Sequence, residues 1–83
     1  MRLDYEHDPR AGQEFHFRVL NGRAPVKIVY YVGNRPYGED ACTDEPCDFV
    51  AEVPAHVEGE FLRLVVSDNS GSEEYRLRIR PAY

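Results

Sequence analysis

Cys42 and Cys47 are the two residues of this 83-residue chain whose type and spacing point most directly to a chemistry. They enclose Thr-Asp-Glu-Pro, so the motif is Cys-x4-Cys and not the Cys-x2-Cys of zinc ribbons and redox motifs. No second Cys or Cys/His pair completes a set of four metal ligands. A local disulfide is therefore the better interpretation, with free thiols or a metal as the alternatives. Such a short loop would stabilise the fold by about 2 kcal/mol, and the bond would imply maturation in an oxidising compartment.

The histidines offer a weaker hint of metal binding. His7 stands beside Asp8 and close to Asp4 in one short segment, whereas His16 lies on the polar side of an alternating run and His56 in a turn. A metal site needs ligands that converge from more than one segment. We therefore expect the first group to be solvated loop residues and expect no metal there.

Nucleophilic catalysis has little support in the hydroxyl residues. Ser67, Ser70 and Ser72 cluster beside Asp68, and no histidine lies in that run. Serines in such a cluster satisfy the backbone groups of a turn more often than they attack a substrate. The chain also has no glycine-rich phosphate loop that opens a helix. We therefore expect no enzyme activity and no cofactor.

Negative charge is concentrated in the middle of the chain. The net charge is −5, but residues 36–60 hold eight acidic residues and no Lys or Arg. Calcium binding by this segment is one hypothesis, although the Asp-x-Asn/Asp-x-Asn/Asp-Gly spacing of a calcium loop is absent; a solvated edge is the other. An acidic chain repels phosphate backbones, so we expect no nucleic-acid partner. The acidic residues around the cysteines are Glu39, Asp40, Asp44, Glu45 and Asp48.

Alternation of apolar and polar residues predicts the elements that carry these side chains, and every predicted element is a β-strand. The run 26–32 is apolar on both faces, which is typical of a central strand. Asp68-Asn69-Ser70-Gly71 has the residue types of a hairpin turn. No apolar run is long enough to span a membrane. We expect one domain over residues 1–83, with clear strands at 3–6, 13–20, 26–32, 49–53, 60–68 and 74–80 and a doubtful one near 35–39.

The order of these runs resembles a known family. The chain passes through Pro-Arg-Ala-Gly-Gln at 9–13, Val-Lys-Ile-Val-Tyr-Tyr at 26–31, Phe-Val-Ala-Glu-Val-Pro-Ala at 49–55 and Leu-Val-Val-Ser-Asp-Asn-Ser-Gly at 64–71. This pattern resembles the framework of bacterial immunoglobulin-like modules, which are related in shape to fibronectin type III domains. The resemblance implies an all-β, immunoglobulin-like Greek-key sandwich of about seven antiparallel strands. It also implies a non-catalytic connector or adhesive module of a longer exported protein, extracellular or at the cell surface.

The chain departs from the resembled family in three places. It has no Trp and no pair of distant cysteines that could join the two sheets, so antibody-type domains are excluded. Tyr30 would take the place of the central aromatic residue. Phe61 stands near the position where a tyrosine corner needs a hydroxyl group.

The best functional candidate is one face of the predicted sandwich. If the strands at 26–32, 60–68 and 74–80 share a sheet, their outward residues form a basic surface with apolar and aromatic members. Arg and aromatic residues are enriched in protein interfaces. The alternative is that long Arg side chains merely cover Val29 and Val65 and keep their charges in water. The candidate binding residues are Lys27, Tyr31, Phe61, Arg63, Arg76, Arg78 and Arg80.

We expect this basic surface to meet a neighbouring domain or a protein partner with acidic groups. One hypothesis is that successive copies stack through it onto the acidic segment. For the chain in isolation we expect a monomer and no insertion into membranes. The alternative function is a carbohydrate- or calcium-binding accessory domain of a secreted enzyme, in which Tyr30, Tyr31 and Tyr37 would form a platform for a sugar ring.

Overall fold

The computed structural model describes residues 1–82, which form seven strands and no helix. Most strands follow the alternation of the sequence, because side chains along a strand point to opposite faces in turn. Within the described residues there is accordingly no helix with the length and apolar character that a bilayer span requires. The strands are β1 (Arg2–Asp4), β2 (Glu14–Leu20), β3 (Val26–Val32), β4 (Arg35–Cys42), β5 (Cys47–Glu52), β6 (Phe61–Asp68) and β7 (Gly71–Arg78).

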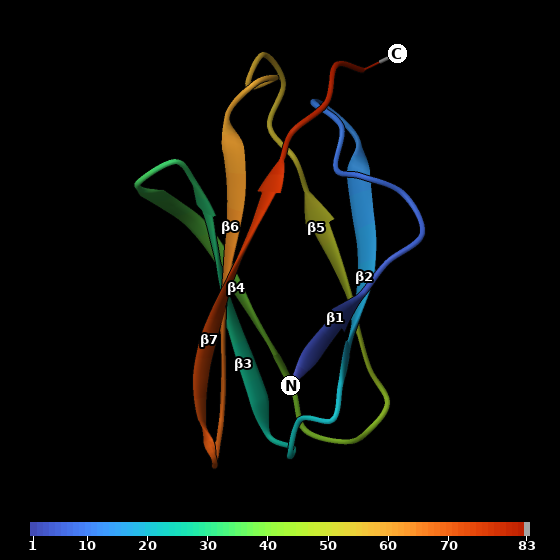
Figure 1. Ribbon diagram of the computed structural model, residues 1–83, viewed down its shortest axis with the longest axis vertical. Coiled ribbons are helices and arrows are strands. Elements are labelled where there is room, and N and C mark those ends of the chain that lie inside the picture. Colours follow the sequence, from blue (N-terminus) through green and yellow to red (C-terminus); the bar gives the residue numbers. More distant parts are fainter. Residues whose placement is uncertain (83) are drawn as a thin grey trace.

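The strands form two antiparallel sheets that face each other (Figure 1). One sheet has the order β1-β2-β5, and the other has the order β4-β3-β6-β7. The chain therefore crosses between the sheets after β2, after β4 and after β5. The prediction of an all-β, sandwich-like fold with seven antiparallel strands is confirmed at this level.

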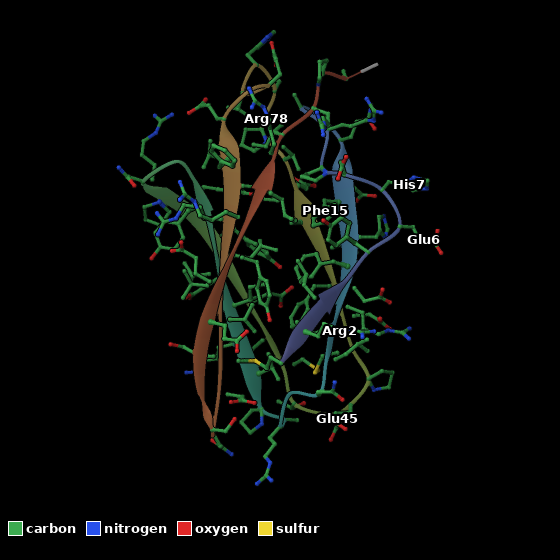
Figure 2. The ribbon with its side chains drawn as sticks, viewed as in Figure 1. Arg2, Glu6, His7, Phe15, Glu45 and Arg78 are labelled. Atoms are coloured by element: carbon green, nitrogen blue, oxygen red, sulfur yellow. A yellow bond between two sulfur atoms is a disulfide. The ribbon has the colours of Figure 1, made fainter. Side chains whose placement is uncertain are left out.

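The space between the sheets is filled by the inward residues of β2, β3, β5 and β6. Ile28, Leu62, Leu64 and Val66 have no exposed surface, and Phe15 lies between the two layers in Figure 2. Removing this apolar surface from water is the main favourable contribution to folding. The aromatic rings of β2 and β5 stack on one another, with centroids 5.3–5.4 Å apart. Tyr30 joins them edge-on and is 5% exposed, in agreement with the central place expected for it.

The predicted strands differ from the observed ones mainly at their ends. The doubtful strand near 35–39 is an eight-residue edge strand, β4, whose first seven residues are all exposed. A strand without a buried face shows no apolar alternation, so only its pairing with β3 reveals it. β7 begins at Gly71 and not at residue 74, because Asp68 pairs directly with Gly71 and the turn holds only two residues.

The predicted disulfide is present. Cys42 is the last residue of β4 and Cys47 the first residue of β5, and their Cα atoms are 5.6 Å apart. These two strands belong to different sheets, so the bond joins the sheets at one end of the sandwich. The sequence separation of five residues had suggested only a closed loop; the link between the sheets follows from the topology.

Candidate binding face

The four-stranded sheet brings most of the predicted basic surface together. β3, β6 and β7 are neighbours, and the register sets Tyr31, Arg63 and Arg76 side by side in one row. Phe61 and Arg78 form the next row towards the end of the sheet. We call the outward side of this region the Arg–aromatic face, and it consists of Tyr31, Phe61, Arg63, Glu74, Arg76 and Arg78.

Lys27 and Arg80 lie apart from this group. Lys27 is on the same side of the sheet, but it is four residues along β3 from Tyr31, a distance of about 13 Å. Arg80 follows the end of β7, where its backbone pairs with residues 9–11. Its guanidinium lies 3.4 Å from Asp8, so its charge is directed to the N-terminal segment. The chain leaves the sheet at this point, and strict alternation therefore stops predicting the direction of side chains.

Arg63 is the anchored residue of the Arg–aromatic face. Its guanidinium donates hydrogen bonds to the carboxylate of Glu74 and, at 2.9 Å, to the carbonyl oxygen of Gly33. Gly33 has a φ of 59°, a left-handed conformation that favours glycine, and the tight turn it forms directs this carbonyl towards β6. The guanidinium carbon also lies 4.9 Å from the centroid of Tyr31, within range of a cation–π interaction.

These contacts are reflected in the pKa values of the pair. The hydrogen bonds from Arg63 lower the pKa of Glu74, and the charges of Arg63 and Arg76 add to this effect. The hydrogen bond to Glu74 in turn raises the pKa of Arg63. Both groups therefore remain charged over a wide pH range, and the pair is a fixed part of the surface.

Arg76 and Arg78 are the available charges of the face. Arg76 stacks over Phe61, with 5.1 Å between its guanidinium carbon and the ring centroid, and Phe61 itself is 39% exposed. Within residues 1–82 the structure gives neither arginine an ion pair. Arg78 is exposed near the end of β7 (Figure 2). The two arginines can therefore donate hydrogen bonds to a carboxylate while the exposed ring of Phe61 packs against an apolar group of the same partner.

Glu74 is the residue that the sequence reasoning missed. It alternates with Arg76 and Arg78 along β7, so the same period that selected the arginines also places it on their side of the sheet. Val65 of β6 is its register partner, and Val29 of β3 lies beyond Val65 in the same row. The surface is thus less basic than predicted, and its free positive charge is concentrated at the Phe61 end.

The acidic residues do not gather into one loop. Glu39 and Asp40 are on β4, whereas Asp48 is on β5, where it accepts a 2.5 Å hydrogen bond from Arg18. Only Asp44 and Glu45 lie between the cysteines. No three His, Cys, Asp or Glu side chains among residues 1–82 are grouped so that they could hold a metal ion.

The three tyrosines of the predicted sugar platform also separate. Tyr30 is buried between the sheets, while its neighbour Tyr31 points to the Arg–aromatic face. Tyr37 lies against Tyr30, with 6.0 Å between the ring centroids. The structure therefore pairs two of them on one side of β3 and directs the third to the other side.

Of the three clustered serines, Ser70 contacts Asp68 within the turn between β6 and β7. Asp68 accepts hydrogen bonds from the backbone N–H groups of Arg23, Ser70 and Gly71 and from the hydroxyl of Ser70. Together these bonds lower the pKa of Asp68 to about 2, and the bond from the Arg23 backbone contributes most to this shift.

His7 lines a cleft of about 930 Å³ beside β2, and the lining of this cleft contains no serine, threonine or cysteine.

Comparisons with known proteins add no relative. No protein-family model, curated protein or solved structure matches the chain.

Proposed function

We propose that this chain is a non-catalytic connector or protein-binding module of the immunoglobulin-like, fibronectin type III-like kind. The strand orders β1-β2-β5 and β4-β3-β6-β7 support this, because the chain alternates between the sheets as a Greek-key path does. Apart from the hydroxyl of Tyr30, the core residues among the described 1–82 are apolar, which suits a domain whose interior serves stability alone.

We further propose that the module belongs to a longer exported protein of bacterial type and acts outside the cell. The disulfide between Cys42 and Cys47 supports export, since such bonds persist in oxidising compartments and are rare in the cytosol.

The observation that carries the binding function is the arrangement of Arg76 and Arg78 around the exposed ring of Phe61. Arg63 has its carboxylate partner within the chain, whereas these two arginines have none among the described residues. A partner that offers carboxylates beside an apolar side chain would satisfy both charges and bury the ring. Arginine and aromatic residues at the centre of a contact contribute most of the binding energy in many interfaces.

The test is a comparison of two double variants that remove the same charge. Arg76→Gln/Arg78→Gln changes the Arg–aromatic face, and Arg2→Gln/Arg23→Gln changes exposed arginines elsewhere. The probe is a fluorescent peptide of alternating Glu and Phe, measured by anisotropy at low and at high salt. We expect the first variant to weaken binding about tenfold or more and the second to change it less than twofold. Equal losses in the two variants would mean that only net charge attracts the peptide, and the proposed face would be rejected.

A further inference from the structure

The outer edge of β7 carries backbone groups that have no partner strand. β7 pairs with β6 along its whole length, and no strand of the described residues lies on its other side (Figure 1). Successive residues of a strand direct their N–H and C=O groups to opposite sides, so every second residue of β7 points these groups away from β6. An edge of this kind is a template for pairing with another strand.

The other outer strands are less suited to such pairing. β4 contains Pro36, which has no N–H group to donate, and its register with β3 shifts at a bulge. β1 has only three residues, and β5 is joined to the end of β4 by the disulfide. β7 contains no proline and keeps one register along all eight of its residues.

The side chains of β7 are complementary to those of a second, antiparallel copy of the same strand. Glu74 and Arg76 lie on the outward side, and Tyr75 lies between them on the inward side. When Tyr75 of one copy stands opposite Tyr75 of the other, Glu74 of each copy faces Arg76 of the other. Opposite charges at directly facing positions stabilise a pair of strands. One symmetrical contact therefore forms two ion pairs.

The same pattern opposes the neighbouring registers. A shift of two residues in one direction places the two copies of Glu74 opposite each other, and a shift in the other direction does this for Arg76. Like charges at facing positions destabilise a pair of strands. The charges therefore favour one register, whose two-fold axis passes between the two Tyr75 residues. A contact with this symmetry is complete at two copies.

The side chains that this contact needs are available on the surface. Arg76 has no ion pair within residues 1–82. Glu74 binds Arg63, and its carboxylate has further lone pairs that can accept from a second arginine. Tyr75 and Leu77 are only partly buried at the border of the core, so a strand placed beside them would cover apolar surface.

Glu73 limits the strength of the contact. It lies on the inward side of β7, where the Tyr75 hydroxyl donates to it at 2.8 Å, and it would face Leu77 of the second copy. A charge that points inward on an edge strand opposes pairing. The contact area of one strand edge is also small, so we expect a dissociation constant on the order of 0.1–1 mM. The chain therefore remains monomeric at the dilution of size-exclusion chromatography.

We propose that two copies of this chain associate through the free edges of β7. The two four-stranded sheets then form one continuous antiparallel sheet, and the ion pairs between Glu74 and Arg76 set its register. This inference goes beyond the proposed function and does not depend on it, because the pairing of two strand edges requires no acidic partner.

The first experiment is sedimentation equilibrium of the unchanged protein at moderate salt, up to millimolar concentration. Salt of this strength screens attraction between distant exposed charges. We expect an equilibrium between monomer and dimer. In ¹⁵N spectra of the same samples, the amides of residues 72–78 should shift with concentration, and those of β4 and β5 should not. The proposal is overturned by the absence of a dimer, by growth beyond two copies, or by shifts centred on other strands.

Two charge reversals then test the register. Glu74→Arg leaves only positive charges at the two facing positions, and Arg76→Glu leaves only negative ones. Each variant alone should therefore dimerise about tenfold more weakly than the unchanged protein. An equimolar mixture restores both pairs of opposite charges and should form a heterodimer about as tight as the original dimer. This recovery also shows that each variant is folded.

The matched controls are Glu58→Arg and Arg23→Glu, which make the same charge changes at exposed residues outside β7. Each control should change the affinity of the dimer by no more than about twofold. A mixture of the β7 variants that stays monomeric, although circular dichroism shows both to be folded, would refute the proposed register. The same loss and recovery in the controls would show that only net charge governs association. None of these outcomes bears on the peptide test of the Arg–aromatic face.

Discussion

At the scale of single residues, the arginines of the face divide into two classes by the contacts that they make. Arg63 is held by Glu74, by the Gly33 carbonyl and by the ring of Tyr31. Arg76, within the described part of the chain, has a cation–π contact with the ring of Phe61 and no ion pair. The period of β7 was enough to place Glu74 beside Arg76 and Arg78 from the sequence. The pairing of Glu74 with Arg63 depends on the register of β6 and β7, which the sequence specifies only through the length of their turn.

Tyr30 gives the first prediction. Because its buried hydroxyl lacks a partner, Tyr30→Phe removes a polar group whose burial costs about 1–3 kcal/mol. We expect the free energy of unfolding, measured by urea titration, to rise by about 1 kcal/mol. Tyr75→Phe is the matched control, since the Tyr75 hydroxyl donates to Glu73 at 2.8 Å and its removal should bring no gain. A loss of stability in Tyr30→Phe would show that the hydroxyl has a partner in solution.

Asp68 gives a prediction about pH. Four hydrogen bonds lower its pKa from 3.8 to about 2, so the charged form is favoured in the folded state. The stability that it contributes is fully present above about pH 4 and is lost as the pH falls towards 2. We expect Asp68→Asn to remove this part of the acid dependence. Melting temperatures of the two proteins should therefore converge as the pH falls from 5 to 2; parallel curves would contradict the assignment. The hydrogen bonds from Arg18 and Arg63 also lower the pKa values of Asp48 and Glu74, but both residues are unchanged in the two proteins and their contributions cancel in the difference.

At the scale of strands, the sequence predicts those elements that bury one face. The pattern in β2, β5 and β6 is visible because inward Phe, Val and Leu alternate with outward polar residues. β4 could not be predicted in the same way, since it is an exposed edge strand held by backbone pairing to β3 and by the disulfide at its end. The hollow between β4 and β5 could not be predicted from the sequence either, because it depends on how closely these two strands approach each other.

The disulfide offers the prediction that belongs to this scale. It closes a short loop and joins the ends of β4 and β5, so Cys42→Ala/Cys47→Ala should lower the free energy of unfolding by about 2 kcal/mol. In a domain of this size that corresponds to a fall of roughly 8–16 °C in melting temperature. Reduction of the unchanged protein, followed by alkylation, should give a similar fall. If the native protein instead takes up two alkyl groups without reduction, the thiols are free and the case for export loses its support.

At the scale of the whole molecule, Arg76 and Arg78 of the Arg–aromatic face lie towards one end, and the acidic loop between the cysteines lies towards the other. Arg78 is near one end of the long axis and Glu45, in the loop between the cysteines, is near the other (Figure 2). The register explains this, because Phe61 pairs with Arg78 at one end of the sheet while Val26 pairs with Cys42 at the other. Copies placed head to tail would therefore bring unlike charges together.

Self-association follows as a prediction from this polarity. We expect a monomer at moderate salt and weak, concentration-dependent association at low salt, because screening shortens the reach of exposed charges. Light scattering after size exclusion measures both states. Arg76→Gln/Arg78→Gln should abolish the association. Association that persists at high salt and in this variant would exclude contact through the Arg–aromatic face.

The most direct test of the binding function is a map of where an acidic partner contacts the molecule. The Glu/Phe peptide is added to ¹⁵N-labelled protein, and cross-saturation from the peptide to the backbone amides is measured. We expect the affected amides to lie on β3, β6 and β7 around Tyr31, Phe61 and Arg76, with β1, β2 and β5 unaffected. Contacts centred on the β1-β2-β5 sheet, or spread over the whole surface, would contradict the proposal that the Arg–aromatic face is the binding site.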